Sequence, residues 1–318
     1  MQQGGSKRNS KPVGIFPHSG KPGTGAVILS LAQFLRRKGV PVLVPTDTAG
    51  MIRTTGKGTA SGLTTATPSE IARRSRFVVA IGGDGSMLAA AREVLPYGTP
   101  VLGINLGKLG FLADIDAEEA VPAVDAVLRG EYRIEKRMTL SGTVGKRCTC
   151  HALNDIVVNK TGTSRVIRIE AFVDDEFLAT FLADGFIVST PTGSTAYSLA
   201  TGGPVVVPSS DVIILSPIAA HALTARPIII PGGSRVRLHA FAEAGAVMVN
   251  ADGEGIVMGA TDVVLTVRRG ARPVRLIKGV GWKYFEMLRK KLAWGQDRRF
   301  PDTFQLEDDT PSVKGCKP

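Results

Sequence analysis

An apolar strand that runs directly into a glycine-rich turn and then into a helix places the strongest limit on how this chain can fold. The strand is Phe77–Ile81, the turn is Gly82-Gly83-Asp84-Gly85-Ser86, and the helix begins at Met87. Because glycine has no Cβ, the backbone of such a turn can approach a ligand closely. The unpaired N–H groups at the start of the following helix attract anions. The segment therefore predicts a β-α unit of a layered sheet, with a phosphate site at the turn.

Asp84 is unusual in a phosphate-binding turn, because a carboxylate repels an anionic ligand. Such a carboxylate is useful if it accepts a proton from a substrate or holds a metal ion. An aspartate at the start of a helix is also a common structural feature of β-α turns. The turn alone leaves both interpretations open.

From residue 12 to about residue 130, the chain alternates the signals of strands and helices. We expect strands at Val13–Phe16, Val40–Val44, Phe77–Ile81 and Val101–Ile104, and helices at Ala26–Lys38 and Ala117–Arg129. This alternation predicts a doubly wound parallel sheet, which binds ligands at the carboxyl ends of its strands. Gly82–Gly85 and Asn105–Gly110 both lie at such ends. Met51–Pro68, rich in glycine and threonine, is expected to be a surface loop.

From about Arg133 onward, short strands such as Arg165–Val173 recur with turns between them, which predicts an all-β domain. A final helix is expected from about Trp282 to Trp294, packing back on the body of the protein. The predicted fold class is thus an α/β N-terminal domain followed by an all-β C-terminal domain. The expected division is a disordered basic N-terminus (1–11), a nucleotide- or phosphate-binding α/β domain (12–132), the all-β domain (133–281), the helix (282–297) and a disordered tail (298–318).

Composition narrows the classes of partner and compartment. The net charge of +11, from 39 Lys and Arg against 28 Asp and Glu, favours anionic ligands. Aromatic residues make up only 6% of the chain and no recognition motif is visible, which argues against nucleic acid. No apolar stretch reaches the roughly 20 residues of a membrane helix, and the polar start has no signal-peptide pattern. Three cysteines are too few for a disulfide framework, so we expect a cytoplasmic protein.

A second informative segment extends from Asp184 to Tyr197. It reads as a strand that enters a Pro- and Gly-containing turn with four hydroxyl residues and then reaches an aromatic side chain. Hydroxyl and backbone N–H groups at such a turn can bind ribose and phosphate oxygens, and Tyr197 could stack on a base. A hydroxyl-rich turn that caps the helix near Ala196 is an equally good interpretation of this segment alone.

Taken together, these segments give the chain a resemblance to the NAD kinase family, which phosphorylates NAD to NADP. Four matches carry it: Gly82–Gly85, Asn105–Leu112, Asn154-Asp155 within Leu153–Val158, and Asp184–Pro204. His221–Pro227 and Asn250–Gly253 extend it, and the coverage runs from about Val13 to Trp294. The glycine turn alone is weak evidence, since phosphofructokinases and diacylglycerol-type lipid kinases share it. The Asp184–Tyr197 segment is the specific part.

The resemblance implies a reaction and a set of roles. Asp84 would be the general base that takes the proton from the adenosine ribose 2′-hydroxyl of NAD, and that oxygen would attack the γ-phosphate of ATP or the end of inorganic polyphosphate. Mg²⁺ would bridge the donor phosphates, with no protein ligand assigned to it. The implied NAD-binding residues are Asp84, Gly85, Asn154, Asp155, Arg165, Asp184, Thr195, Ala196, Tyr197, Ser198, Leu199 and Ala200. The implied phosphate- or ATP-binding residues are Gly82, Gly83, Gly85, Ser86, His18 and Lys108, and further candidates for ligand contact are Phe111, His221, Asp252 and Glu254.

Some of these implications are more detailed than others. Asp155 suits a ribose diol, Asp184 would bind the nicotinamide end, and Arg165 matches a position that reaches NAD from its own or a neighbouring subunit. The family resemblance also implies a homodimer or homotetramer with the β domains at the interface. Ser86 stands where the family commonly has Thr, which also carries a hydroxyl. Asp155 stands where Glu is frequent and is one methylene shorter, which puts in doubt how the ribose is held and the substrate preference, but not the class of reaction.

Alternative functions remain open on the sequence. A lipid or sugar kinase would use the same glycine turn, but it explains the Asp184–Tyr197 segment poorly. A non-catalytic regulator that binds NAD(P) or polyphosphate would gain nothing from an anion at the phosphate, so Asp84 argues against it. For His18, Lys108 and His221, an ordinary loop residue is a full alternative to a ligand contact. The chain has neither a Walker motif nor the His-Arg-Asp loop of protein kinases.

Overall fold

The computed structural model describes residues 11–18, 20–48, 62–107, 109–145, 148–162 and 166–294. The predictions for Lys108 and Arg165 lie outside these residues. So do those for residues 1–10 and 298–318, and most of the predicted loop from Met51.

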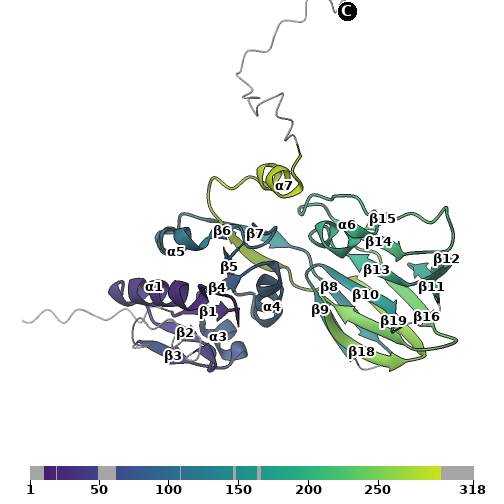
Figure 1. The fold of residues 1–318 in the computed structure, drawn as a ribbon, viewed down its shortest axis with the longest axis horizontal. Coiled ribbons are helices and arrows are strands. Elements are labelled where there is room, and N and C mark those ends of the chain that lie inside the picture. The colour runs from purple at the N-terminus through teal and green to yellow at the C-terminus, as the bar shows by residue number, and fades with distance from the viewer. Residues whose placement is uncertain are drawn as a thin grey trace, which may run out of the picture. The chain divides into compact units, whose positions relative to one another are not determined.

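A mainly parallel sheet, sheet A, forms the first part of the fold (Figure 1). Its strands are β1 (Val13–Pro17), β2 (Val42–Val44), β3 (Leu63–Thr65), β4 (Phe77–Gly82), β5 (Val101–Asn105), β6 (Ile115–Asp116), β7 (Arg133–Arg137) and β20 (Val274–Lys278). The main order is β3-β2-β1-β4-β5-β20-β7, and β6 pairs with β5. All pairs are parallel except β20 with β7. The predicted doubly wound parallel sheet is confirmed.

Helices cover both faces of sheet A, as Figure 1 shows. On one face lie α1 (Thr24–Arg37) and α5 (Ala120–Arg129), which follows a short 3-10 turn η1 (Ala117–Glu119). On the other lie α3 (Pro68–Arg74) and α4 (Asp84–Val94). The start of α3 is fixed by a capping box in which Thr67 and Glu70 exchange hydrogen bonds. Strands buried between two helical layers explain why the sequence shows them as continuous apolar runs.

One expected loop contains a strand. Residues Leu63–Thr65 lie within the segment predicted as a surface loop, yet they form the edge strand β3, in parallel register with Val42–Val44. Their side chains are half-buried or exposed, so they lack the apolar pattern that marks the inner strands. The loop prediction was wrong for these residues because the neighbouring strand supplies backbone hydrogen bonds whatever the side chains are.

Two antiparallel sheets form the second part of the fold. Sheet B has the order β12-β11-β16-β19-β8-β9 and sheet C the order β15-β14-β13-β10-β17-β18. Sheet B consists of β8 (Leu140–Val144), β9 (Cys148–Ala152), β11 (Ile167–Val173), β12 (Glu176–Ala183), β16 (Val236–Phe241) and β19 (Asp262–Arg269). Sheet C consists of β10 (Asp155–Lys160), β13 (Gly185–Ser189), β14 (Val212–Ile218), β15 (Ile228–Pro231), β17 (Val247–Ala251) and β18 (Glu254–Ala260). One apolar cluster with residues from both sheets forms the core, which confirms the all-β prediction.

The connections between the two parts matter for the site. Strand β7 belongs to sheet A, and the chain then continues into sheets B and C. Strand β20, which follows those two sheets in the sequence, belongs to sheet A again and lies between β5 and β7. The predicted boundary at residue 132 therefore stays a prediction, since sheet A takes two strands from the chain beyond it. After β13, the turn η2 (Gly193–Thr195) and the short helix α6 (Tyr197–Ala200) precede β14.

The described residues 281–294 belong to a separate unit. Within it, α7 (Tyr284–Leu292) confirms the predicted C-terminal helix, whereas its packing on the rest of the chain stays a prediction. In the part of the chain that the structure describes, no helix is long and apolar enough to cross a membrane.

Candidate active site

The carboxylate of Asp84 lies at the start of α4 and is held by backbone N–H groups of a second glycine-rich loop. Its Oδ2 accepts a hydrogen bond from the N–H of Phe111 at 2.9 Å. Its Oδ1 accepts from Leu112 at 2.9 Å and from Ala113 at 3.2 Å. The two loops predicted at the carboxyl edge of sheet A are thus joined through this one side chain. Phe111, a candidate for ligand contact, takes part through its backbone.

The glycines of the turn allow this close packing. Gly82 has φ of +155°, and a Cβ added to it would lie 2.0 Å from Ser86 Oγ and 2.9 Å from the Cβ of His18. A side chain there would displace Ser86, so glycine is required both for its backbone conformation and for space. The hydroxyl of Ser86 is buried and has no hydrogen-bond partner among the described residues.

Residues from the loop after β1 reach the same turn. The backbone N–H of His18 donates to the Ile81 carbonyl at 2.8 Å, and its exposed side chain lines a cavity of about 400 Å³ with Gly85 and Ser86. Lys21 donates from Nζ to the Gly82 carbonyl at 3.3 Å. The sequence reasoning did not single out Lys21. Its position after a predicted strand, at the same sheet edge as Asp84, was the signal that could have identified it.

Asn154 and Asp155 form a second part of the site, and Asp252 holds them in place. Asp252 Oδ1 accepts from the N–H groups of Asn154 at 2.7 Å and Asp155 at 3.2 Å, and its Oδ2 accepts from Leu153 at 2.7 Å. Asp252 has φ of +50°, a conformation that Asp adopts more readily than most residues. Its carboxylate therefore faces the backbone of the Asn154-Asp155 turn, which supports that turn rather than presenting the carboxylate to solvent.

Burial shifts the ionisation of both aspartates. Burial raises the pKa of Asp155 to about 7, and the nearby charge of Asp252 adds to the effect. Burial also raises the pKa of Asp252, against the opposing effect of its three backbone hydrogen bonds. Near neutral pH, the Asp155 carboxyl exists in both forms, so it can donate a hydrogen bond as well as accept one.

The hydroxyl-rich turn predicted from the sequence packs against Asn154. Thr190 donates from Oγ1 to the Leu153 carbonyl at 2.6 Å, and its N–H donates to the Asn154 carbonyl at 2.8 Å. The Gly193 N–H donates to Thr190 Oγ1 at 3.0 Å, and a Cβ on Gly193 would lie 2.2 Å from the Asn154 carbonyl oxygen. Several hydroxyls of this turn thus serve the backbone, which was the structural interpretation left open above.

Beyond this turn, the predicted NAD-binding residues differ in exposure. Thr195, Ala196 and Leu199 are half-buried, while Tyr197 is 44% exposed and Ala200 is exposed. Ser198 is buried, with its hydroxyl 3.2 Å from that of Ser216. Asp184 forms an ion pair with Lys160 at 2.8 Å. His221 is exposed in the connection between β14 and β15.

Packing brings the segments from the two parts of the fold together. Leu153, directly before Asn154, is buried in the same apolar cluster as Met87 of α4 and Leu112 of the loop that holds Asp84. Arg137, at the end of β7, donates to Thr192 of the hydroxyl-rich turn at 3.3 Å. The glycine turn, the Asn154-Asp155 turn and the hydroxyl-rich turn, which are distant in sequence, are therefore neighbours in the fold.

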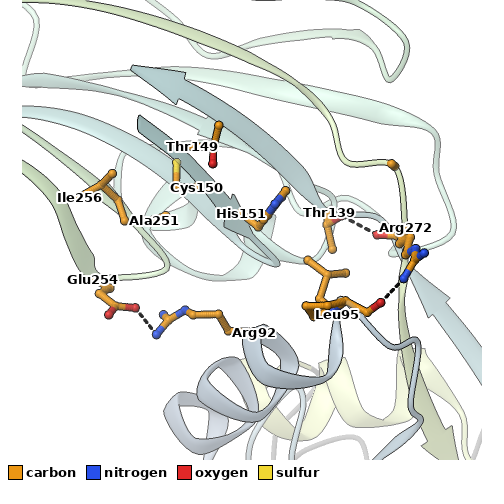
Figure 2. Close-up of a pocket in the computed structure, with 12 residues that line it drawn as sticks. Arg92, Leu95, Thr139, Thr149, Cys150, His151, Ala251, Glu254, Ile256 and Arg272 are labelled. Carbon is orange, nitrogen blue, oxygen red and sulfur yellow. Dashed lines mark hydrogen bonds and ion pairs between the residues drawn. The ribbon is translucent and has the colours of Figure 1, made fainter. Parts of the chain in front are cut away.

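A larger cavity of about 560 Å³ lies farther along α4 (Figure 2). Its lining includes Arg92 of α4, Leu95 directly after α4, His151 of β9 and Glu254 of β18. Arg92 forms an ion pair with Glu254. Arg92 is eight residues beyond Asp84, which is about 12 Å along a helix. Glu254, a candidate for ligand contact, lines this cavity and pairs with Arg92.

Comparison with protein families identifies both parts of the chain. Residues 13–132 match the ATP-NAD kinase N-terminal domain, and residues 153–279 match the ATP-NAD kinase C-terminal domain. The chain is 43% identical over 305 residues to the NAD kinase of Moorella thermoacetica, covering 95% of this chain and 93% of that protein. It is 38% identical over 288 residues to the NAD kinase of Thiobacillus denitrificans, covering 89% and 97% respectively.

Solved structures show the same fold. Yeast NADH kinase complexed with NADH matches with a TM-score of 0.82 at 26% identity, covering 90% of this chain and 88% of the yeast chain. An NAD kinase from Archaeoglobus fulgidus, in complex with ATP, matches with a TM-score of 0.68 at 24% identity, covering 89% and 99%. The second similarity is low in sequence and supports the fold alone.

Proposed function

The chain belongs to the ATP-NAD kinase family and is a kinase, and from this premise we propose that it phosphorylates the 2′-hydroxyl of the adenosine ribose of NAD, with ATP or inorganic polyphosphate as the donor. The observation that carries the proposal is the position of Asp84. A carboxylate stands at the carboxyl edge of a parallel sheet, beside a glycine turn, and next to the turns that contain Asn154 and Thr192. Besides fixing the loop at residues 111–113, this carboxylate places an anion beside a phosphate site, which favours a reaction over phosphate binding alone.

In this proposal, Asp84 is the general base. Three backbone N–H groups fix its carboxylate, two on Oδ1 and one on Oδ2. Since each carboxylate oxygen offers two lone pairs, Oδ2 can still accept the proton of the 2′-hydroxyl. The remaining work of a phosphoryl transfer is positioning and stabilisation of charge, which a rigidly held base supports.

The donor phosphates would bind on the sheet side of the same turn. Several groups that can bind phosphate lie around the glycine turn: the backbone N–H groups of Gly83 and Gly85, the hydroxyl of Ser86, the side chain of His18 and the ammonium group of Lys21. Among the described residues, no three His, Cys, Asp or Glu side chains gather as metal ligands. We expect a Mg²⁺ ion to be held mainly by phosphate oxygens and water, with one or two carboxylates at most. When bound, such an ion offsets the charge that develops on the transferred group.

NAD would bind along the turns of the second part of the fold. Asp155, able to donate and accept at neutral pH, suits a ribose diol, and the exposed ring of Tyr197 suits stacking on a base. The other NAD contacts that the resemblance implies, including Arg165 and Asp184, stay predictions. The yeast relative is a kinase of NADH, so acceptance of NADH by this chain is a further expectation to test. A homodimer or homotetramer and a cytoplasmic location also stay predictions.

NADP formation by the purified protein tests the proposal. Wild type should convert NAD to NADP with Mg²⁺ and either ATP or polyphosphate, and Asp84→Asn should lower kcat by about 10²- to 10⁴-fold, the usual share of a general base. Asp175→Asn, in the exposed turn between β11 and β12, is a matched control that removes one carboxylate and should keep full activity. Near-normal turnover by Asp84→Asn would remove Asp84 from this role. Absence of NADP with either donor would reject the proposed reaction.

A further inference from the structure

A buried ion pair lies directly behind the loop that holds Asp84. Lys278, the last residue of β20, has a side chain only 1% exposed, and its Nζ lies 2.8 Å from Oδ1 of Asp114, which is 7% exposed. Burial lowers the pKa of Lys278, and the charge of Asp114 opposes that effect. Removing two charges from water costs free energy that their attraction repays only in part, so a buried pair is weak evidence of a gain in stability. The role of this ion pair is therefore better explained by the backbone that it holds in place.

The ion pair holds the backbone of the Asp84 loop. Besides pairing with Asp114, Lys278 donates from Nζ to the carbonyl oxygen of Leu112 at 3.1 Å. The N–H of the same Leu112 donates to Asp84 at 2.9 Å, and Ala113 follows at 3.2 Å. Residue 112 is thus bound on one side to the proposed base and on the other to a cation that the chain supplies 166 residues later.

The rest of this loop has little room to adjust. The N–H of Gly110 donates to the Ala113 carbonyl at 3.0 Å, which closes the loop on itself. Leu112 and Ala113 are 2% and 0% exposed and pack in the cluster that contains Met87 and Leu153. A displacement of residues 112–114 would therefore be transmitted to the Asp84 carboxylate, because its N–H donors belong to the same rigid segment.

We propose that Lys278, together with Asp114, is a positioning residue for phosphoryl transfer, which fixes the backbone donors that orient the Asp84 carboxylate. The proposal rests on the proposed function, in which Asp84 is the base. Lys278 acts through the peptide groups of residues 112 and 113. Its ammonium group is held inside the protein by Asp114 and by the Leu112 carbonyl.

Steady-state kinetics of Lys278→Met and Asp114→Asn test the proposal. Each variant should lower kcat by about 10- to 100-fold, the effect of a catalytic group that is displaced by a fraction of an ångström to about 1 Å. The KM for NAD should change less than about threefold. Lys136→Met is the matched control: Lys136 lies on the adjacent strand β7 with an exposed side chain, and its loss should leave kcat unchanged.

Combination with Asp84→Asn separates positioning from general structural support. If Lys278 acts through Asp84, Lys278→Met should cause no further loss of kcat in the Asp84→Asn background, because residues that act as a unit are not additive. Multiplicative losses, an unchanged kcat in Lys278→Met, or an effect confined to KM would each overturn the proposal. If Lys278→Met does not fold, Asp114→Asn, which keeps the side-chain volume, decides by the same readouts. Full activity of Asp84→Asn would instead reject the proposed function itself.

Discussion

Replacement of Gly110 by alanine would test the geometry of the site without removing any reactive group. Gly110 is buried, and a Cβ built on it would lie 2.1 Å from Oδ1 of Asp84 and 2.9 Å from the Ala113 carbonyl oxygen. Ordinary contacts of a Cβ begin at about 3.4 Å. The carboxylate and the loop must therefore separate by about 1 Å, which weakens the hydrogen bonds that hold Asp84.

The size of the expected loss follows from this displacement. A misplacement of about 1 Å at a catalytic group costs about 10²-fold in rate, so we expect kcat of Gly110→Ala to fall by about 10- to 100-fold. Forcing one extra methyl group into a packed site also costs about 1–3 kcal/mol of stability. The KM for NAD should change little, because Asn154 and Asp155 are held by Asp252 and not by Gly110.

The assay is NADP formation under saturating donor, together with urea unfolding to confirm that the variant is folded. Gly233→Ala is the matched control: Gly233 has no atom within 4 Å of an added Cβ and no positive φ. It should keep the kcat and the stability of the wild type. If folded Gly110→Ala has the kcat of Gly233→Ala, then either the carboxylate tolerates the displacement or Asp84 does not act as the base, and the reasoning fails.

Three further predictions concern other parts of the site. Asp155 binds its proton more tightly in the folded protein than in the unfolded chain, so the stability it contributes is full below pH 3.8 and is lost as the pH rises to about 7. The free energy of unfolding of Asp155→Asn, measured with urea, should therefore exceed that of wild type by about 2–4 kcal/mol between pH 5 and pH 8. The exposed control Glu243→Gln should show no such gain. Lys21→Met should raise the KM for ATP about tenfold and leave the KM for NAD unchanged, as expected for one lost phosphate contact. Asp252→Asn, which keeps the left-handed backbone accessible, should raise the KM for NAD about tenfold with little change in kcat, as expected when one charge-assisted hydrogen bond is weakened; a fall in kcat alone would contradict its assigned role.

Much of the fold could be predicted from local sequence patterns. Phe77–Ile81 is a continuous apolar run because β4 is buried on both faces, and the glycine turn after it follows from the need for a close backbone approach. Alternating apolar positions likewise predicted strands such as β11 in the all-β part. The edge strand β3 was missed, since it takes its pairing from β2 and carries no apolar pattern of its own.

The sequence supplied candidate residues for the site but not the contacts that hold them. Asp84 and Asp252 were both singled out, yet the sequence did not indicate that each carboxylate accepts three backbone N–H groups. Lys21 and Lys278 were not singled out at all. A lysine in a basic chain carries no local signal, and its role depends on which backbone carbonyl or carboxylate the fold brings to it.

The sequence by itself determined the two kinds of sheet, the glycine turn with its aspartate and the family to which the chain is similar, because these depend on short-range periodicity and on residues adjacent in the chain. Only the tertiary structure decided that β20 returns to sheet A, that Leu153 packs against α4, and that Asp155 is buried beside Asp252. Burial, pairing partners and electrostatic environment arise from contacts between residues far apart in the chain, and these determine what each carboxylate and each lysine can do.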